Sequence, residues 1–168
     1  MRGLYIGRFQ PFHNGHKAVA EYIAEEADEL IVGIGSPQIS HEPLHPFTAG
    51  ERILMITQSL ADLKIPYYVL PVTDVYRNAI WVSHVISMVP KFDVVYSSNP
   101  QVIRLFEEAG IEVHSPPMYD RDRLSGTAIR ELMKYGGNWE ELIPKEAAEV
   151  IRSIGGIRRI QQISQSDE

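Results

Sequence analysis

The chain has 168 residues, which is enough for one compact domain with a hydrophobic core and too few to expect two. Apolar residues make up 44% and charged residues 23% of the chain, as in ordinary soluble globular proteins. The formal net charge of −6 argues against the broad basic face that DNA or RNA binding needs. The negative net charge is still compatible with a small phosphate ligand that is held by a few local arginines.

The chain contains no cysteine, which excludes disulfides, thiolate zinc sites and a cysteine nucleophile. No apolar run approaches the roughly 18 residues of a membrane span. The first residues, Met1 to Gly7, lead directly into a strand pattern and leave no room for a signal peptide. We therefore expect a cytoplasmic protein that contacts neither membrane nor nucleic acid.

Apolar segments typical of buried parallel strands alternate with helical segments along the chain. The expected strands are Leu4–Gly7, Glu29–Ile34, Tyr67–Val72, Phe92–Tyr96 and Ile111–His114. The first expected helix covers Lys17–Glu26, and the second follows a capping box at Thr48–Glu51. Further helices are expected to begin at Asn78, at Asn99-Pro100 and at Ser125, and the last long helix at Pro144. This alternation predicts a doubly wound, Rossmann-like α/β fold, with a parallel sheet, helices on both faces and further helices at the C-terminus. We expect one domain over residues 1–160 and a polar tail over residues 161–168.

The loop after the first strand reads Gly7-Arg8-Phe9-Gln10-Pro11-Phe12-His13-Asn14-Gly15-His16. In a doubly wound fold, ligands bind beyond the carboxyl ends of the strands, so this strand-to-helix loop is a candidate site. His13 and His16 are three residues apart and face the same side of the helix that begins there. Gly15 would let a ligand approach the backbone, and the helix N-terminus together with Arg8 favours an anion.

Two other interpretations of these histidines stay open. A single histidine is more often a satisfied or solvent-facing residue than a ligand. Zinc binding is the other functional alternative, with His41 and His45 as further ligands, although H-x-x-H alone provides no third ligand.

A second candidate segment is Ser125-Gly126-Thr127-Ala128-Ile129-Arg130. Ser125 and Thr127 offer hydroxyls and backbone N–H groups to phosphate oxygens at the start of a helix, and Arg130 lies on the same face. The structural alternative is a plain helix cap at Ser125.

The first loop resembles the H-x-G-H signature of a nucleotidyltransferase superfamily, and its fuller form, GRFQPFH, is similar to the archaeal-type nicotinamide mononucleotide (NMN) adenylyltransferases. The second segment resembles the superfamily motif I-S-S-T-x-x-R, with Leu124 and Gly126 in place of Ile and Ser. The resemblance runs from Met1 to about Ile160. It implies a nucleotidyltransferase domain over residues 1–160.

This resemblance implies an enzyme of NAD biosynthesis that transfers AMP from ATP to the 5′-phosphate of NMN. Direct in-line attack would give NAD⁺ and pyrophosphate. Magnesium would accompany ATP, held mainly by its phosphates, with no metal site in the protein. The implied catalytic residues are His13 and His16 at the α-phosphate and Arg130 at the β- and γ-phosphates. The implied phosphate-binding residues are Gly7, Arg8, Phe9, Gly15, Ser125 and Thr127.

The family also implies that Asn78 and Trp81 line the nicotinamide pocket, where an aromatic face suits a pyridinium ring. Trp81 could instead be a core residue and Asn78 a helix cap. Arg52 either lines the site or pairs with a carboxylate, and Asn99 either contacts nucleotide or caps a helix.

Several alternatives remain open at this point. The acceptor could be nicotinate mononucleotide, flavin mononucleotide or phosphopantetheine. The chain could also be a regulator that binds nucleotide without catalysis, or a zinc hydrolase. Archaeal relatives are hexamers, which implies a homo-oligomer here.

Overall fold

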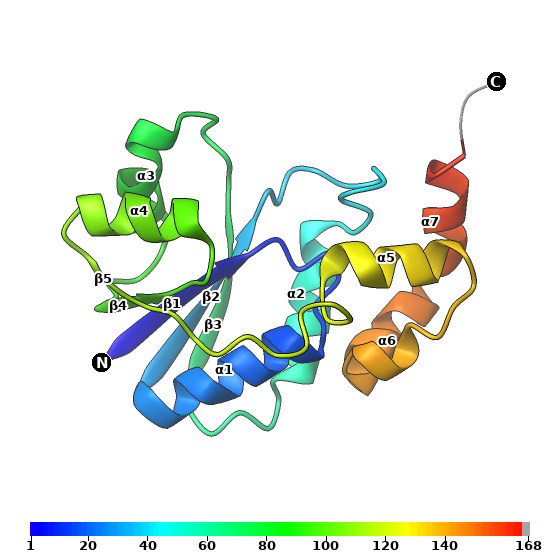
Figure 1. Cartoon of the computed structure of the whole chain (residues 1–168), viewed down its shortest axis with the longest axis horizontal. Coiled ribbons are helices and arrows are strands. Elements are labelled where there is room, and N and C mark those ends of the chain that lie inside the picture. Colours follow the sequence, from blue (N-terminus) through cyan, green and yellow to red (C-terminus); the bar gives the residue numbers. More distant parts are fainter. Residues whose placement is uncertain (166–168) are drawn as a thin grey trace. The chain divides into compact units, whose positions relative to one another are not determined.

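The computed structural model describes residues 1–165, which form two compact units. The first unit consists of residues 1–7, 19–37 and 63–118, and the second of residues 8–18, 38–62 and the described chain from 119 onward. Figure 1 shows the elements of both in sequence colours. Every helix within the described residues is too short or too polar to cross a membrane.

The first unit is built on a five-stranded parallel sheet with strand order β3-β2-β1-β4-β5. The strands are β1 (Arg2–Gly7), β2 (Glu29–Gly35), β3 (Tyr67–Val72), β4 (Val94–Tyr96) and β5 (Glu112–His114). All five predicted strands are therefore confirmed, with small differences at their ends. The strand order reverses between β1 and β4, and such a switch point is where doubly wound sheets bind ligands.

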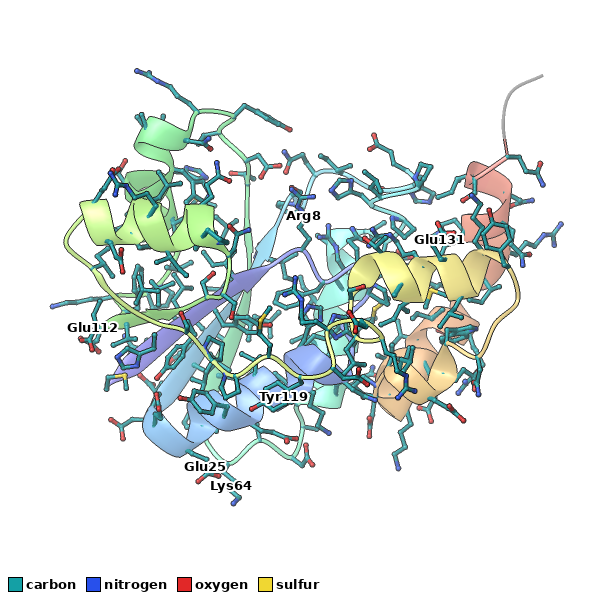
Figure 2. All side chains as sticks on the ribbon, in the orientation of Figure 1. Arg8, Glu25, Lys64, Glu112, Tyr119 and Glu131 are labelled. Atoms are coloured by element: carbon teal, nitrogen blue, oxygen red, sulfur yellow. The ribbon has the colours of Figure 1, made fainter. Side chains whose placement is uncertain are left out.

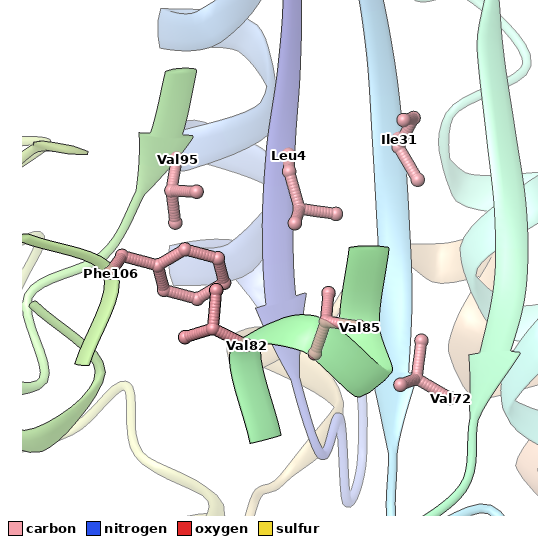
Figure 3. Packing of buried hydrophobic residues seen from close by; sticks show 7 residues of the cluster. All are labelled: Leu4, Ile31, Val72, Val82, Val85, Val95 and Phe106. Carbon is pink, nitrogen blue, oxygen red and sulfur yellow. The ribbon is translucent and has the colours of Figure 1, made fainter. Parts of the chain in front are cut away.

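One face of this sheet is covered by α3 (Trp81–Met88), which follows the 3₁₀ turn η1 (Asn78–Ile80), and by α4 (Pro100–Glu108). Side chains of neighbouring strands meet side chains of both helices in one buried cluster, shown in Figure 3. The cluster consists of Leu4, Ile31, Val72, Val82, Val85, Val95 and Phe106. Leu4 pairs in register with Ile31 and Val95, so three adjacent strands contribute side chains at the same level.

The opposite face is covered by the later turns of α1 (Asn14–Glu26). A Cβ atom on Gly3 would lie only 2.7 Å from the Tyr96 ring and 3.4 Å from Cγ2 of Ile23. The glycine thus lets the tyrosine ring and the helix pack closely on β1. Helices on both faces confirm the predicted doubly wound α/β fold.

The second unit is helical. It contains the start of α1, α2 (Ala49–Ser59), α5 (Gly126–Lys134), the 3₁₀ turn η2 (Glu140–Leu142), α6 (Lys145–Ser153) and α7 (Gly156–Ile163). Helix α2 packs against α6, and α5 packs against α7. The helix predicted from Pro144 is wrong as one long element, because the chain breaks at Gly155, which has a left-handed φ of 66°. Helix α7 extends into the predicted tail, of which residues 166–168 lie outside the described residues.

A polar cluster in the first unit connects the end of α1 to the edge strand β5. The carboxylate of Glu26 accepts hydrogen bonds from the hydroxyls of Tyr22 at 3.0 Å and Tyr96 at 2.9 Å. His114 lies 3.5 Å from Glu26 and 2.6 Å from Glu112; Figure 2 labels Glu112. The hydrogen bond to Glu112, followed by that to Glu26, raises the pKa of His114 above its ordinary value.

We expect this cluster to make the stability of the protein depend on pH. Because the folded-state pKa of His114 is raised, its contribution is complete below the unfolded pKa near 6.5 and is lost as pH rises through the folded value. The pairs are partly exposed, so the effect should be at most about 1 kcal/mol, or about 2 to 4 °C in melting temperature. Thermal unfolding of wild type and His114→Gln at pH 6 and pH 8.5 measures it. A difference between the two proteins that is equal at both pH values would contradict this assignment.

Candidate active site

The first turn of α1 is capped by two histidines that bond to each other's backbone. His13 immediately precedes the helix, and its Nδ1 accepts hydrogen bonds from the backbone N–H of Gly15 at 3.1 Å and of His16 at 3.4 Å. In return, Nδ1 of His16 accepts from the backbone N–H of His13 at 3.1 Å. This is the reciprocal geometry of a capping box, formed here by imidazoles in place of Ser/Thr and Glu.

The two imidazole rings are stacked, with centroids 3.5 Å apart. The ring of His16 also stacks on Phe12 at 5.5 Å and meets the edge of Phe9 at 4.8 Å. The predicted common orientation of His13 and His16 is therefore confirmed. Phe9 is 1% exposed, so its side chain packs against the ring of His16 within the site.

Gly15 has a different local role from the one expected. A Cβ atom at this position would lie 2.9 Å from Cε1 and 3.0 Å from Nδ1 of His13, and 3.4 Å from Cβ of Leu124. The space above the glycine is thus occupied by the imidazole of His13, where the sequence suggested a ligand. A glycine is needed here because any side chain would displace that ring.

Both histidines are neutral at physiological pH. Burial, with a contribution from the charge of Arg121, lowers the pKa of His13 to about 4. The pKa of His16 is well below its ordinary value, mainly because of burial and then because of His13 and Arg121. Since each Nδ1 accepts from the backbone, the proton of each neutral ring is on Nε2. The motif therefore presents two neutral N–H donors.

Two buried polar side chains hold the loop that carries these histidines. The amide of Gln10, 3% exposed, donates to the carbonyl of Phe47 at 3.0 Å and accepts from its N–H at 2.9 Å. Arg52 is completely buried and donates to the carbonyls of Arg8 at 2.8 Å and Thr48 at 3.2 Å. Arg52 is thus a residue that fixes the backbone, next to Phe9, whose φ of 53° is unusual for a residue with a side chain.

The start of α5 forms the other wall of this site. Ser125 is the N-cap, with its Oγ accepting from the N–H of Ala128 at 3.1 Å, as the structural alternative predicted. The guanidinium of Arg130 folds back over the helix start and donates to the carbonyl of Gln10 at 2.9 Å and to Oγ1 of Thr127 at 3.4 Å. A Cβ atom on Gly126 would be 2.6 Å from Nη1 of Arg130, so a larger residue there would move the guanidinium from its present position.

The charge that acts on these donors is mainly positive. Arg8, Arg121 and Arg130 form no ion pair with any carboxylate of residues 1–165, whereas the neighbouring Arg123 pairs with Asp120 at 3.3 Å. Burial, then the nearby charge of Arg8, lowers the pKa of Arg130, although an arginine stays protonated. Figure 2 labels Arg8 in the loop after β1 and Glu131 on α5. Cations without counter-ions, neutral N–H donors and helix N-termini are the groups that an anion site requires.

Four of the predicted site residues belong to the first unit. Gly7 is the last residue of β1. Asn99 caps α4, its Oδ1 accepting from two backbone N–H groups at 2.9 and 3.4 Å, as the structural alternative predicted. Trp81 is partly buried and meets Phe106 edge-on at 5.4 Å, while Asn78 is exposed at the start of η1.

Sequence reasoning missed Gln10 and Arg121. The only sequence signal for a role of Gln10 in the site was its position inside the first motif. Arg121 was one of two arginines in a polar loop, and nothing local distinguishes it from Arg123. Residues 1–165 contain no group of three or more His, Cys, Asp or Glu placed to hold a metal ion.

Comparisons with known proteins identify the family of the chain. Residues 4–132 match the family described as cytidylyltransferase-like. A nicotinamide-nucleotide adenylyltransferase of Methanocorpusculum labreanum is 67% identical over 99% of both chains, and one of Haloarcula marismortui is 58% identical over 99% of this chain and 89% of its own. The chain belongs to this family of nicotinamide-nucleotide adenylyltransferases.

Solved structures share the fold at much lower identity. A bifunctional NMN adenylyltransferase/ADP ribose pyrophosphatase from Francisella tularensis, complexed with AMP and a manganese ion, has a TM-score of 0.77 at 21% identity. The match covers 96% of this chain and 52% of that one, so this chain spans about half the length of that protein. A NadR protein in complex with NAD and AMP-PNP has a TM-score of 0.63 at 18% identity over 90% of this chain and 45% of its own.

The close approach of His13 to Gly15 leads to a test with a matched control. We expect Gly15→Ala to displace the imidazole of His13 and to weaken ATP binding about tenfold, the equivalent of one charge-assisted hydrogen bond. Gly50 occupies the same second position of α2, and a Cβ atom there meets nothing within 4 Å. Gly50→Ala should therefore leave the affinity unchanged in calorimetric titrations with ATP. Equal affinities for the two variants would show that the ring position does not matter.

Proposed function

We propose that this chain catalyses transfer of the AMP part of ATP to the 5′-phosphate of NMN, forming NAD⁺ and pyrophosphate. The observation that carries the proposal is the anion site of the second unit, where His13 and His16 present neutral donors and three arginines have no counter-ion. The identity of 67% to a full-length nicotinamide-nucleotide adenylyltransferase supports the choice of reaction. Residues 1–160 would act as one nucleotidyltransferase domain.

The chemistry needs positioning and charge neutralisation more than a strong base. The 5′-phosphate of the acceptor is already ionised and attacks the α-phosphorus in line, while pyrophosphate leaves. In this scheme His13 and His16 donate to the α-phosphate through Nε2. Arg130 and the hydroxyls of Ser125 and Thr127 hold the β- and γ-phosphates. Arg8, on the loop after β1, neutralises charge shared between donor and acceptor phosphates.

The acceptor would be selected by its pyridine ring. By the family resemblance, Trp81 offers an aromatic face to the positively charged nicotinamide and Asn78 an amide to its carboxamide. Neither role is in conflict with the contacts of these residues in the first unit, because Trp81 is only partly buried and Asn78 is exposed.

Magnesium would enter with ATP. The donors of the phosphate site are mostly guanidinium, imidazole N–H and backbone N–H groups, which bind phosphate oxygens and offer Mg²⁺ no lone pair, so the hydroxyls of Ser125 and Thr127 are the only oxygen ligands among them. The metal would therefore be held mainly by phosphate oxygens and water. We further propose that the protein works in the cytoplasm as a homo-oligomer, a hexamer by family resemblance.

An acceptor panel tests the proposed function. Pyrophosphate release is measured with ATP, Mg²⁺ and, in parallel, nicotinamide, nicotinate and flavin mononucleotides and phosphopantetheine. Release with a pyridine mononucleotide and formation of the dinucleotide is the expected result. If protein that binds ATP releases pyrophosphate with none of these acceptors, it is a nucleotide-binding regulator instead.

The double use of His16 allows its catalytic and capping contributions to be separated. His16→Ala removes both the N–H donor and the cap, so we expect turnover to fall about a hundredfold. The lost cap should also lower the free energy of unfolding by about 1 kcal/mol.

His16→Gln is the matched variant, because a glutamine at this position of a capping box can accept from the N–H of His13. It should lose turnover to a similar extent and keep its stability. Turnover within a few-fold of wild type in both variants would remove His16 from the mechanism.

A further inference from the structure

His45 has an unusual environment for a buried imidazole. Its side chain is 12% exposed, and both ring nitrogens are buried without a hydrogen-bond partner among residues 1–165. Buried polar atoms in folded proteins are nearly always paired, and an unpaired one costs free energy. Such an atom is therefore expected to have a partner that is not part of the chain itself.

The backbone of His45 is held in a short antiparallel hairpin. His45 and Glu42 exchange backbone hydrogen bonds of 2.9 and 3.2 Å. The carboxylate of Glu42 is 3.9 Å from Nδ1, which is too far for a hydrogen bond. The hairpin thus fixes the backbone that carries the ring but does not satisfy the ring nitrogens.

The charged groups that face this ring are mainly cations. Burial and then Arg8 lower the pKa of His45, with smaller contributions from Arg130 and Arg52, while Glu42 acts in the opposite direction. Arg52 is completely buried and donates to two backbone carbonyls, whereas Arg8 is exposed and Arg130 only partly buried, so Arg8 and Arg130 are the cations that a ligand can reach. By contrast, the cation that acts on His13 and His16 is Arg121. His45 therefore belongs to the Arg8–Arg130 part of the anion site.

We propose that His45 is an additional ligand-binding residue that donates a hydrogen bond to the pyrophosphate part of ATP, beside Arg8 and Arg130. The inference rests on the proposed function, which places the β- and γ-phosphates at Arg130. The nitrogens are covered in the ligand-free protein, so the hairpin of residues 41–46 shifts when the phosphates enter.

Proton uptake distinguishes His45 from the paired histidines. In the ligand-free protein the three facing arginines and burial keep its ring neutral. A bound polyphosphate offsets those arginines and favours the charged ring, so binding takes up a proton near neutral pH. His13 and His16 do not behave in this way, because protonation of Nδ1 would break the backbone bonds that cap α1.

The test compares His45→Phe with His41→Asn, using inorganic pyrophosphate as the probe. Phenylalanine preserves the ring shape and removes the unpaired nitrogens. His41 is exposed in the same hairpin with a left-handed φ of 58°, which asparagine tolerates. Calorimetric titrations at pH 6.5, in two buffers with different ionisation enthalpies, give both the affinity and the number of protons taken up.

We expect His45→Phe to bind pyrophosphate about tenfold more weakly than wild type, the size of one charge-assisted bond, and to take up fewer protons than wild type by the share of the His45 ring. Its ligand-free form should unfold at a higher temperature than wild type, because the two unpaired buried ring nitrogens are removed. His41→Asn should match wild type in affinity and proton uptake. Unchanged affinity and proton uptake in His45→Phe would overturn the inference and leave the proposed function intact. Absence of pyrophosphate binding by the wild type would contradict both the inference about His45 and the proposed phosphate site.

Discussion

The reciprocal capping of α1 by His13 and His16 is the interaction on which the proposed phosphate site depends. A helix start exposes backbone N–H groups that must be satisfied, and here the two imidazoles satisfy them through Nδ1. This one constraint fixes the three-residue spacing of the histidines, their stacking at 3.5 Å and the need for Gly15 beneath the ring of His13. It also leaves the proton of each neutral ring on Nε2, so in the proposed mechanism the groups that cap the helix are the same groups that bind the ligand.

This arrangement divides the work between neutral donors and permanent charges. Imidazoles that accept from the backbone resist protonation, which makes them directional donors with little charge. The positive charge comes from arginines, which keep it under burial, as Arg130 does beside Arg8. Arg52 is completely buried and Gln10 almost completely buried, and their hydrogen bonds hold the loop after β1 in a fixed position. Such preorganisation is what a reaction without a covalent intermediate requires, because the protein has only to place and neutralise phosphates.

The sequence predicted the parallel strands, the caps at Thr48, Asn99 and Ser125, and the two phosphate motifs, because these depend on local patterns. It did not predict the functions that depend on contacts between distant segments. The pairing of Gln10 with Phe47, the support of the Arg8 carbonyl by Arg52 and the position of Arg121 beside the histidines all join residues at least 37 positions apart. The break between α6 and α7 was also missed, because Gly155 stands within an amphipathic pattern that continues on both sides. The resemblance to a family supplied the reaction, and only the structure showed which side chains lie against Gly15 and Gly126.

The central claim is that His13 and His16 are neutral rings with their protons on Nε2. Nitrogen-15 NMR of histidine-labelled protein at pH 7 tests it directly, because protonated and unprotonated ring nitrogens resonate in separate ranges. We expect both residues to show an unprotonated Nδ1 and a protonated Nε2, and the pattern to persist when ATP binds. A charged ring, or a proton on Nδ1 of either residue, would contradict the capping arrangement and the mechanism built on it.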